Sequence, residues 1–266
     1  MAIKFSIIIP NYNSEHHIIK LLDSIKAQTF RDYEVIIVDD MSTDNSPSII
    51  ENYIAGNELQ DKFYFTQLTK KRYNGGTRNY GVEMADGDYI LFADCDDWFT
   101  SYKCLEELNK VIKPDTELVR LSYSPCVDNY VGFVRLHENT LEDLAHTMFV
   151  APWTKCIRRE LFVPFPENTL IEDIVQHIAQ IDVIQNFTYC ETPIMVWNRD
   201  NKDAISSDTR KYDRDSKRYS SIYRNVADLI DLKVNHGYCK EEREKRIEWY
   251  LDKIHNQKES SIVRTG

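Results

Sequence analysis

Residues 33–40 read Tyr-Glu-Val-Ile-Ile-Val-Asp-Asp, an apolar run that ends in two acids. Its apolar part has almost no alternation of polar and apolar residues, which is typical of a parallel strand buried on both faces. A similar pattern recurs at residues 89–97, where Tyr-Ile-Leu-Phe-Ala is followed by Asp-Cys-Asp-Asp. A further apolar strand is predicted at Phe5–Pro10. Patterns with helical spacing alternate with these strands, so the first hundred residues predict an α/β sheet.

Three helices are expected between these strands. Apolar residues recur at helical spacing over residues 18–25, with Ser14 as the predicted cap. A second helix is expected to begin at residues 42–44 and to run to about Ile54. The Gly-rich stretch at residues 74–76 is predicted to be a turn that precedes a third helix.

The pattern changes after residue 100. A helix is expected over about 101–112, followed by strand-like runs at 118–124 and 130–136 that are expected to pair antiparallel. A helix over 172–181 and two short strands ending near Trp197 complete the prediction. The sheet is therefore predicted to be mixed.

Composition limits the function. The chain has 266 residues and a formal net charge of −10, which argues against a protein that coats nucleic acid electrostatically. Its six cysteines include no C-x-x-C pair and indicate reduced thiols. The apolar runs are far shorter than the ~18 residues of a membrane span, and the N-terminus shows no secretory signal. We therefore expect a cytoplasmic protein.

Acidic residues gather where two predicted strands end. Asp39 and Asp40 follow one strand, and Asp94, Asp96 and Asp97 follow another. Ligands of open α/β sheets bind outside the carboxyl ends of the strands, and crowded carboxylates repel one another unless a cation neutralises them. Mg²⁺ and Mn²⁺ prefer oxygen ligands and bind diphosphates, so the pattern predicts a nucleoside diphosphate site.

The alternative is that these acids only cap the helices that follow. For Asp39 alone the two interpretations weigh equally, whereas three acids within residues 94–97 favour the functional one.

Other kinds of site are excluded because the chain lacks their sequence motifs. The chain has no G-x-x-x-x-G-K-[ST], G-x-G-x-x-G or G-x-S-x-G, and an EF-hand from Asp94 would meet Phe99 and Leu105 at its sixth and twelfth positions.

Four segments, in order, resemble family 2 glycosyltransferases of the GT-A fold. They are Phe5–Asn13, Glu34–Asp44, Gly75–Gly81 and Asp88–Trp98. The resemblance implies a GT-A catalytic domain over residues 1–208, a mixed, mostly parallel α/β sheet flanked by helices. Residues 1–100 are expected to form its nucleotide-sugar-binding half and residues 101–208 its acceptor-binding half. Residues 209–266 are expected to be a helical C-terminal extension.

The resemblance also implies roles for residues on the nucleotide side. Pro10 and Tyr12 correspond to the wall of the uridine pocket, with Asn13 beside them. Asp40 resembles the acid that accepts the uracil N3 proton, and Arg78 resembles the cation near the nucleotide.

Asp94 and Asp96 resemble the Asp-x-Asp motif, Asp94 toward the sugar or ribose and Asp96 holding Mn²⁺ or Mg²⁺. The chain departs from the family's pattern at Met41, usually Gly, and at Cys95, usually a small residue. The basic triplet at residues 70–72 could assist phosphate binding, although such triplets are more often solvated loops.

On the acceptor side, Trp153 and Lys155 resemble the family's Trp-x-Lys segment. Glu172 and Asp173 resemble its Glu-Asp pair, which makes Asp173 the expected catalytic base; the alternative is an acid that stabilises a helix N-terminus. His177 lies four residues after Asp173 and either orients it or meets the acceptor. The alternative, which we favour, is that His177 is a solvated or half-buried helix residue.

These features predict an inverting, metal-dependent glycosyltransferase that moves a sugar from a UDP-sugar to a hydroxyl of a saccharide or glycoconjugate. The protein is expected to be cytoplasmic or to dock peripherally at a membrane. Three alternatives stay open: glycosylation of a hydroxymethylated nucleic-acid base, a non-catalytic scaffold that binds nucleotide sugars, and a sugar nucleotidyltransferase. The last would need a Gly-rich basic loop after the first strand, where the chain has Pro10–Asn13.

Overall fold

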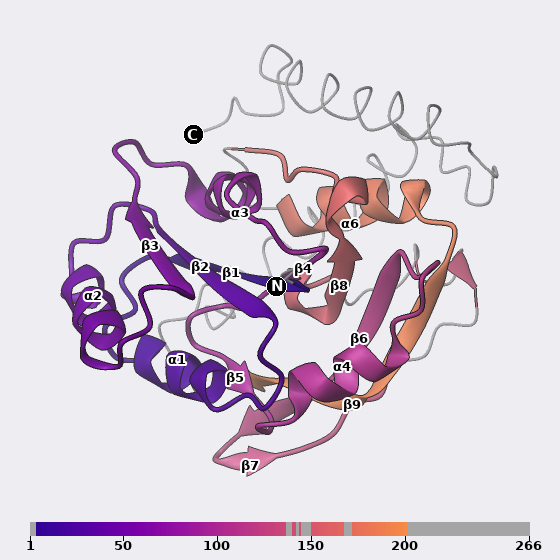
Figure 1. The fold of residues 1–266 in the computed structure, drawn as a ribbon, viewed down its shortest axis with the longest axis horizontal. Helices are drawn as coiled ribbons and strands as arrows, with labels where there is room; N and C mark the ends of the chain where they lie inside the picture. Colours follow the sequence, from indigo (N-terminus) through magenta and orange to yellow (C-terminus); the bar gives the residue numbers. More distant parts are fainter. Residues whose placement is uncertain (1–3, 137–139, 142–143, 145–149, 168–171, 202–266) are drawn as a thin grey trace.

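The computed structural model describes residues 4–136, 140–141, 144, 150–167 and 172–201, in which a nine-stranded sheet lies between two groups of helices (Figure 1). The strands are β1 (Phe5–Asn11), β2 (Tyr33–Asp39), β3 (Phe63–Gln67), β4 (Tyr89–Phe92), β5 (Trp98–Phe99), β6 (Leu118–Val127), β7 (Tyr130–Val131), β8 (Lys155–Arg158) and β9 (Phe187–Asn198). The helices are α1 (Ile18–Lys26), α2 (Ser46–Gly56), α3 (Tyr73–Glu83), α4 (Cys104–Val111) and α6 (Glu172–Val183), with 3₁₀ turns η1 (Pro152–Thr154) and η2 (Arg159–Leu161). None of these helices has the length and apolar character needed to cross a bilayer. The predicted extension at 209–266 lies outside the described residues.

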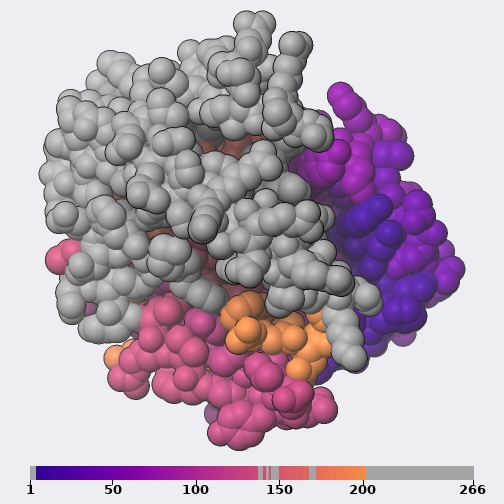
Figure 2. All heavy atoms as spheres, turned by 180° about the vertical axis from the view of Figure 1, so that it is seen from behind, coloured from indigo at the N-terminus to yellow at the C-terminus, as the bar shows by residue number. Residues whose placement is uncertain are grey.

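The strands follow the order β3-β2-β1-β4-β8-β6-β9-β5, with β7 paired to β6. The first four strands are parallel, β8 is antiparallel to both of its neighbours, and β6 and β9 run parallel to each other. The predicted mixed, mostly parallel sheet is therefore confirmed. From behind, the early segments (indigo to purple) and the later ones (pink to orange) occupy different sides of the molecule, in keeping with this order (Figure 2). Because β1, β2 and β4 are parallel, their carboxyl ends meet at one edge of the sheet.

Alternate residues of β1 belong to two hydrophobic cores. Ile7 and Ile9 lie in the core shared with α1, α2 and α4, whereas Ile8 lies in the core shared with Ile181 of α6. All four side chains are buried. A fully buried isoleucine contributes about 1.5–3 kcal/mol, so the uniformly apolar sequence of β1 is what holds helices on both faces of the sheet.

Two helices begin later than predicted. The Ser14 hydroxyl does not cap α1: it donates to Oδ1 of Asn11, while the Ser14 carbonyl accepts the N–H of Ile18 (3.1 Å). Helix α2 begins at Ser46, and its N–H donates to the carboxylate of Asp44 (3.0 Å). In both loops, polar groups at or before the start of the helix form hydrogen bonds with one another, and these bonds delay the first helical turn. The spacing of apolar residues does not reveal them.

The turn predicted at residues 74–76 is wrong, because these residues lie inside α3. The first N–H groups of a helix have no partner within it and need one from elsewhere. Here the Asp40 carboxylate accepts the N–H groups of Arg72 (2.7 Å) and Tyr73 (2.9 Å). A residue more than thirty positions earlier therefore sets the start of α3, so no local turn is required.

The later strands also differ from the prediction. The expected pair of short strands before Trp197 is one strand, β9, of 12 residues. Its register against β6 jumps between the Leu121 and Tyr123 pairings, and this irregularity accommodates Pro193 without ending the strand. The run at 130–136 does pair antiparallel, but only through β7 and an isolated bridge from Tyr123.

The variant Gly81→Ala tests the packing of α3 on the sheet. A Cβ at Gly81 would overlap Cγ2 of Ile8 and lie 3.5 Å from Cγ2 of Val38, so the helix would have to move away from β1. We expect a loss of about 1–3 kcal/mol in the free energy of unfolding and a Tm lower by several degrees, measured by thermal denaturation. The control is Gly56→Ala at the end of α2, where a Cβ meets nothing within 4 Å. Equal melting temperatures for the two variants would contradict this packing.

Candidate active site

The carboxyl end of β2 is held by Asp39, which is completely buried. Its carboxylate accepts hydrogen bonds from the side-chain amides of Asn11 (2.6 Å) and Gln67 (2.9 Å) and from the N–H of Ser42 (2.9 Å). These donors come from the ends of β1 and β3 and from the loop after β2. Asp39 therefore ties three strand ends together, which is a structural role.

Asp40 lies beside it with a different set of partners. Besides the two N–H groups at the start of α3, its carboxylate lies 3.9 Å from Nζ of Lys71. The same ammonium lies 3.1 Å from the centre of the Tyr12 ring, which is half exposed. Tyr12, Lys71 and Asp40 thus form an aromatic, cationic and anionic group at the end of β1 and β2.

The neighbouring loop adopts left-handed backbone conformations. Asn13 has φ 49° and its side-chain oxygen accepts the N–H of Thr43 (2.8 Å). Met41, where the family usually has glycine, has φ 62°. The methionine therefore keeps the backbone region that glycine adopts freely, at a cost of roughly 1 kcal/mol.

Arg78 on α3 joins the segment after β4 to the start of α6. Its guanidinium is buried and pairs with Asp94 after β4 (Nη2 to Oδ1, 2.9 Å) and with Glu172 at the start of α6 (Nη1 to Oε1, 3.2 Å). Its Nε is also buried and has no hydrogen-bond partner in the part of the chain that the structure describes. The predicted nucleotide-side cation therefore also contacts the predicted acceptor-side acid pair.

Three acids crowd the end of β4. Burial raises the pKa of Asp96, and repulsion from Asp94 raises it further, although the amide of Asn201 donates to Oδ2 (2.8 Å). Burial, with repulsion from Asp94 and Asp96, also holds the pKa of Asp97 well above its usual range. Neutralisation by a cation would remove this repulsion.

Asp94 and Asp96 offer carboxylate oxygens as ligands for a divalent metal. No group of three or more His, Cys, Asp or Glu side chains within the described residues is arranged to hold one. Mg²⁺, however, is usually held by one or two carboxylates together with the phosphates of a substrate. Two carboxylates beside the buried acid Asp97 fit such a site, although Asp94 is also paired with Arg78.

Glu172 and Asp173 begin α6 next to Arg78. Burial raises the pKa of Asp173, and the positive charge of Arg78 partly opposes this increase. The pKa of Glu172 is raised in the same way. An Asp with a raised pKa at the start of a helix is suited to accept a proton.

Other predicted acceptor residues lie in the interior. Trp153 packs edge-on against Tyr123, with ring centres 5.3 Å apart, and is only 3% exposed. Lys155 is completely buried and donates to the Val150 carbonyl (2.8 Å) and to Nδ1 of His177 (3.2 Å). Both side chains are therefore buried among other protein groups rather than exposed at a surface.

His177 does not have the neighbour that the spacing suggested. Because lysine only donates, Nδ1 of His177 accepts from Lys155 and Nε2 donates to the Leu144 carbonyl (2.8 Å). Burial and the nearby cations Lys155 and Arg120 hold the pKa of His177 well below its usual value. His177 is thus a neutral, completely buried residue, whereas the sequence favours a solvated or half-buried one, and its ring nitrogens bond to Lys155 and Leu144.

Sequence reasoning misses three contacts. It favours a solvated loop for Lys71, finds no signal at Asn201, and treats Cys95 only as a departure from the family's pattern. The Cys95 thiol contacts the Pro10 carbonyl (3.0 Å) and Oδ1 of Asn11 (3.3 Å), so it joins the end of β1 to the acidic segment. Only the basic triplet at residues 70–72 offers a hint of the first contact.

The sequence profile of glycosyl transferase family 2 matches residues 6–162, more than half of the chain. The chain belongs to this family. The resemblance inferred from four segments is therefore confirmed, and so is the expected enzyme class at the level of the family.

Named family 2 relatives and solved structures resemble parts of the chain. TarS of Staphylococcus aureus (strain Mu50), a poly(ribitol-phosphate) beta-N-acetylglucosaminyltransferase, is 43% identical over 98 residues, which are 36% of this chain and 16% of TarS. The glycosyltransferase GlyG of Streptococcus pneumoniae serotype 4 is 27% identical over 61% of this chain and 59% of GlyG. The crystal structure of TarS residues 1–349 with UDP-GlcNAc covers 96% of this chain and 74% of that chain, with TM-score 0.70 and 23% identity. The Pyrobaculum calidifontis mannosyltransferase PcManGT with GDP-Man and Mn²⁺ covers 97% of this chain and 76% of that chain, with TM-score 0.62 and 17% identity. These structures confirm the GT-A fold.

The crowded acids predict a pH-dependent gain in stability for Asp97→Asn. Because the folded protein holds the Asp97 proton more tightly than the unfolded chain does, Asp97 costs stability as the pH rises from about 4 through its raised pKa. The substituted amide keeps an oxygen for the N–H of Asn198, which donates to Asp97 at 2.8 Å. In metal-free buffer we expect Tm to rise by at least about 2 °C at pH 7 and not at pH 4. Asp61→Asn, at an exposed acid, is the control, and an equal gain at both pH values would refute the raised pKa of Asp97.

Proposed function

We propose that this protein is an inverting, metal-assisted glycosyltransferase that moves a sugar from a UDP-sugar to an acceptor hydroxyl. The observation that carries the proposal is the buried Arg78, which pairs with Asp94 on the donor side and with Glu172 beside Asp173. It brings the predicted Asp-x-Asp motif and the predicted base into one site, although they are about eighty residues apart in sequence.

The nucleoside would bind at the ends of β1 and β2. Tyr12 offers an exposed ring for stacking, flanked by Pro10 and by the loop that Asn13 holds. Each carboxylate oxygen accepts two hydrogen bonds. Asp40 can therefore accept a hydrogen bond from the N3–H group of uracil while it keeps its hydrogen bonds to the start of α3. Lys71, next to both residues, would stabilise the negative charge of the nucleotide.

The diphosphate would bind at the acids after β4. Asp96 would hold Mn²⁺ or Mg²⁺, with Asp94 directed to the sugar or ribose while it stays paired with Arg78. When bound, the metal supplies neutralisation of the charge that develops on the departing diphosphate. The buried guanidinium of Arg78 adds a fixed positive charge to the same region.

Asp173 would act as the base. It would accept the proton of the acceptor hydroxyl during attack on the anomeric carbon, and a carboxylate on the side opposite the leaving group gives inversion of configuration. A raised pKa makes Asp173 a better proton acceptor than an exposed carboxylate. Activity should rise with pH through that pKa, because only the deprotonated form can take the proton.

The relatives guide the choice of substrates. TarS has been crystallised with UDP and with UDP-GlcNAc, which favours UDP-sugars as the first donors to test. The relatives named by their acceptors act on poly(ribitol-phosphate), which favours a saccharide or glycoconjugate acceptor over a nucleic-acid base. The scaffold alternative loses weight because Asp96 and Asp173, whose loss would mark an inactive enzyme, are both present.

The donor site predicts metal-dependent binding of UDP. We expect calorimetry to detect UDP binding with Mn²⁺ or Mg²⁺ and a loss of at least tenfold in affinity in EDTA or in Asp96→Asn, because the carboxylates alone repel the diphosphate. The adjacent variant Asp97→Asn should keep the affinity within about twofold, since Asp97 faces the interior. Equal affinity with and without metal would exclude a metal-held diphosphate.

If Asp173 is the base, its substitution should lower the rate of sugar transfer without changing the affinity for UDP. We expect Asp173→Asn to lower transfer from UDP-GlcNAc, followed as UDP release with a panel of saccharide acceptors, by about 10²–10⁴-fold while UDP affinity is unchanged. The control is Glu167→Gln, a nearby acid that lies 4.0 Å from Arg72. Full turnover by Asp173→Asn would remove this residue from the mechanism.

A further inference from the structure

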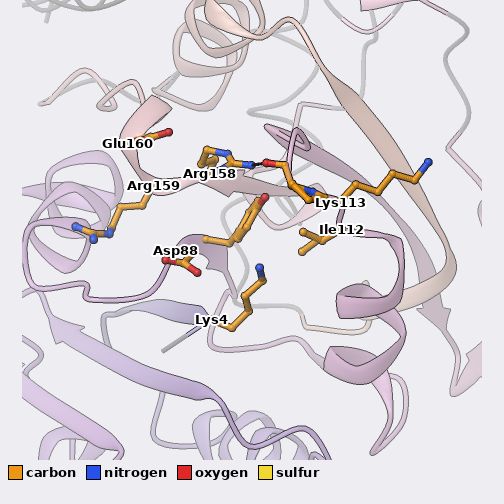
Figure 3. Close-up of a pocket in the computed structure, with 9 residues that line it drawn as sticks. Lys4, Asp88, Ile112, Lys113, Arg158, Arg159 and Glu160 are labelled. Atoms are coloured by element: carbon orange, nitrogen blue, oxygen red, sulfur yellow. Dashed lines mark hydrogen bonds between the residues drawn. The ribbon is translucent and has the colours of Figure 1, made fainter. Parts of the chain in front are cut away.

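A hollow of about 510 Å³ opens at the amino ends of the parallel strands. It is lined by residues that precede β1 and β4, by the segment after α4 and by the junction of β8 and η2 (Figure 3). The lining residues are Lys4, Asp88, Tyr89, Ile112, Lys113, Pro114, Arg158, Arg159 and Glu160. None of them belongs to the candidate active site.

The residues that line the hollow carry a net positive charge, opposite in sign to the net charge of the chain. The chain has a formal net charge of −10, yet four cations and two carboxylates line this surface. Within the described part of the chain, none of the four cations forms an ion pair, although Asp88 and Glu160 line the same hollow. Their charges are therefore available to a bound anion.

The centre of the hollow is rigid. Arg158 donates from Nε and Nη2 to the Thr116 carbonyl (3.0 and 2.6 Å) and from Nη2 to the Pro114 carbonyl (2.6 Å). The Tyr89 hydroxyl donates to the same Thr116 carbonyl (2.6 Å). Lys4 Nζ lies 4.8 Å and the Arg158 guanidinium 5.4 Å from the centre of the Tyr89 ring. Because neutral carbonyls hold Arg158, its position is fixed while its charge is not cancelled.

The other cations lie at the rim. Figure 3 shows the Arg159 and Lys113 side chains extending to opposite sides of the centre, and both residues are exposed. Arg159 is anchored by one bond, from Nε to the Gly87 carbonyl (2.7 Å), which leaves its terminal nitrogens for a ligand. Cations spread around a hollow of this size match a ligand with several negative groups better than a single small ion.

The hollow is remote from the donor site. β1 has seven residues, and at about 3.3 Å per residue its two ends are about 20 Å apart. The acids of the donor site lie beyond the carboxyl end of the same strands. Whatever binds at the hollow therefore binds in addition to a nucleotide sugar and is independent of the proposed function.

We propose that this hollow is a second binding site, for a ligand that carries several phosphate groups. The two terminal nitrogens of Arg159 can bind a pair of phosphate oxygens, Nη1 of Arg158 adds one further donor, and Lys4 adds a point charge. Asp88 and Glu160 at the rim oppose the most negative ligands but leave a net positive surface. The phosphates are either those of a soluble ligand or those of lipid headgroups.

The test uses the full chain in low salt with EDTA and inorganic tripolyphosphate, followed by calorimetry. Without metal the aspartates of the donor site repel phosphate, so binding under these conditions reports the hollow. We expect one site, an affinity that falls steeply with salt, and a weakening of at least fivefold in Lys4→Gln and in Arg159→Gln. The matched control is Lys103→Gln, since Lys103 also lies near a tyrosine ring, 5.7 Å from the centre of Tyr102, but outside the hollow.

Vesicles distinguish the two sources of phosphate. The site takes lipid headgroups if the protein binds phosphatidylglycerol vesicles but not phosphatidylcholine vesicles. In that case tripolyphosphate should release the protein from the vesicles, and Lys4→Gln should weaken its binding to them. Tripolyphosphate binding without vesicle binding assigns a soluble ligand. No binding of tripolyphosphate to the wild type, or equal weakening in Lys103→Gln and Lys4→Gln, overturns the proposal. Thermal denaturation of each variant verifies that the fold is retained.

Discussion

The buried guanidinium of Arg78 constrains the rest of the site. A charge removed from water is tolerated only when it is paired and hydrogen-bonded, and loss of one partner of a buried pair typically costs about 3–5 kcal/mol. Asp94 after β4 and Glu172 at the start of α6 provide the two partners here. The loop after β4 and the start of α6 are therefore held in place by the same cation, and with them the proposed metal ligand and the proposed base.

The carboxyl edge of the sheet uses similar acids for different purposes. Asp39 directs its carboxylate to side chains and backbone of the surrounding loops, so it maintains the edge itself. Asp40 holds the start of α3 but remains next to the exposed Tyr12 ring. The acids after β4 are crowded, and the raised pKa values of Asp96 and Asp97 reflect their burial together with repulsion from Asp94. Position along the edge, not residue type, separates the structural acids from those suited to a ligand.

The sequence predicts those features that depend on the pattern of neighbouring residues. The apolar runs of β1, β2 and β4 predict buried parallel strands, and the acids that follow them predict a ligand site at one edge. The start of α3 is missed because its N–H groups are satisfied by Asp40, far away in sequence. Likewise, helical spacing places His177 next to Asp173, whereas its partner in the structure is Lys155 of β8. Contacts of this kind are set by how the layers pack, and no local pattern encodes them.

Helix α3 connects the proposed nucleoside site to the proposed catalytic acids. Its first N–H groups bind Asp40, and five residues after Tyr73, a rise of about 8 Å, it presents Arg78 to Asp94 and Glu172. Gly75 lets the helix approach Pro166 and the start of α6 closely, because a Cβ there would lie 2.6 Å from the Pro166 carbonyl oxygen and 3.2 Å from Cβ of Glu172. Asp40 therefore holds the first turn of α3 and the acids Asp94 and Glu172 hold its middle, so the same helix fixes the position of Arg78 relative to Asp40.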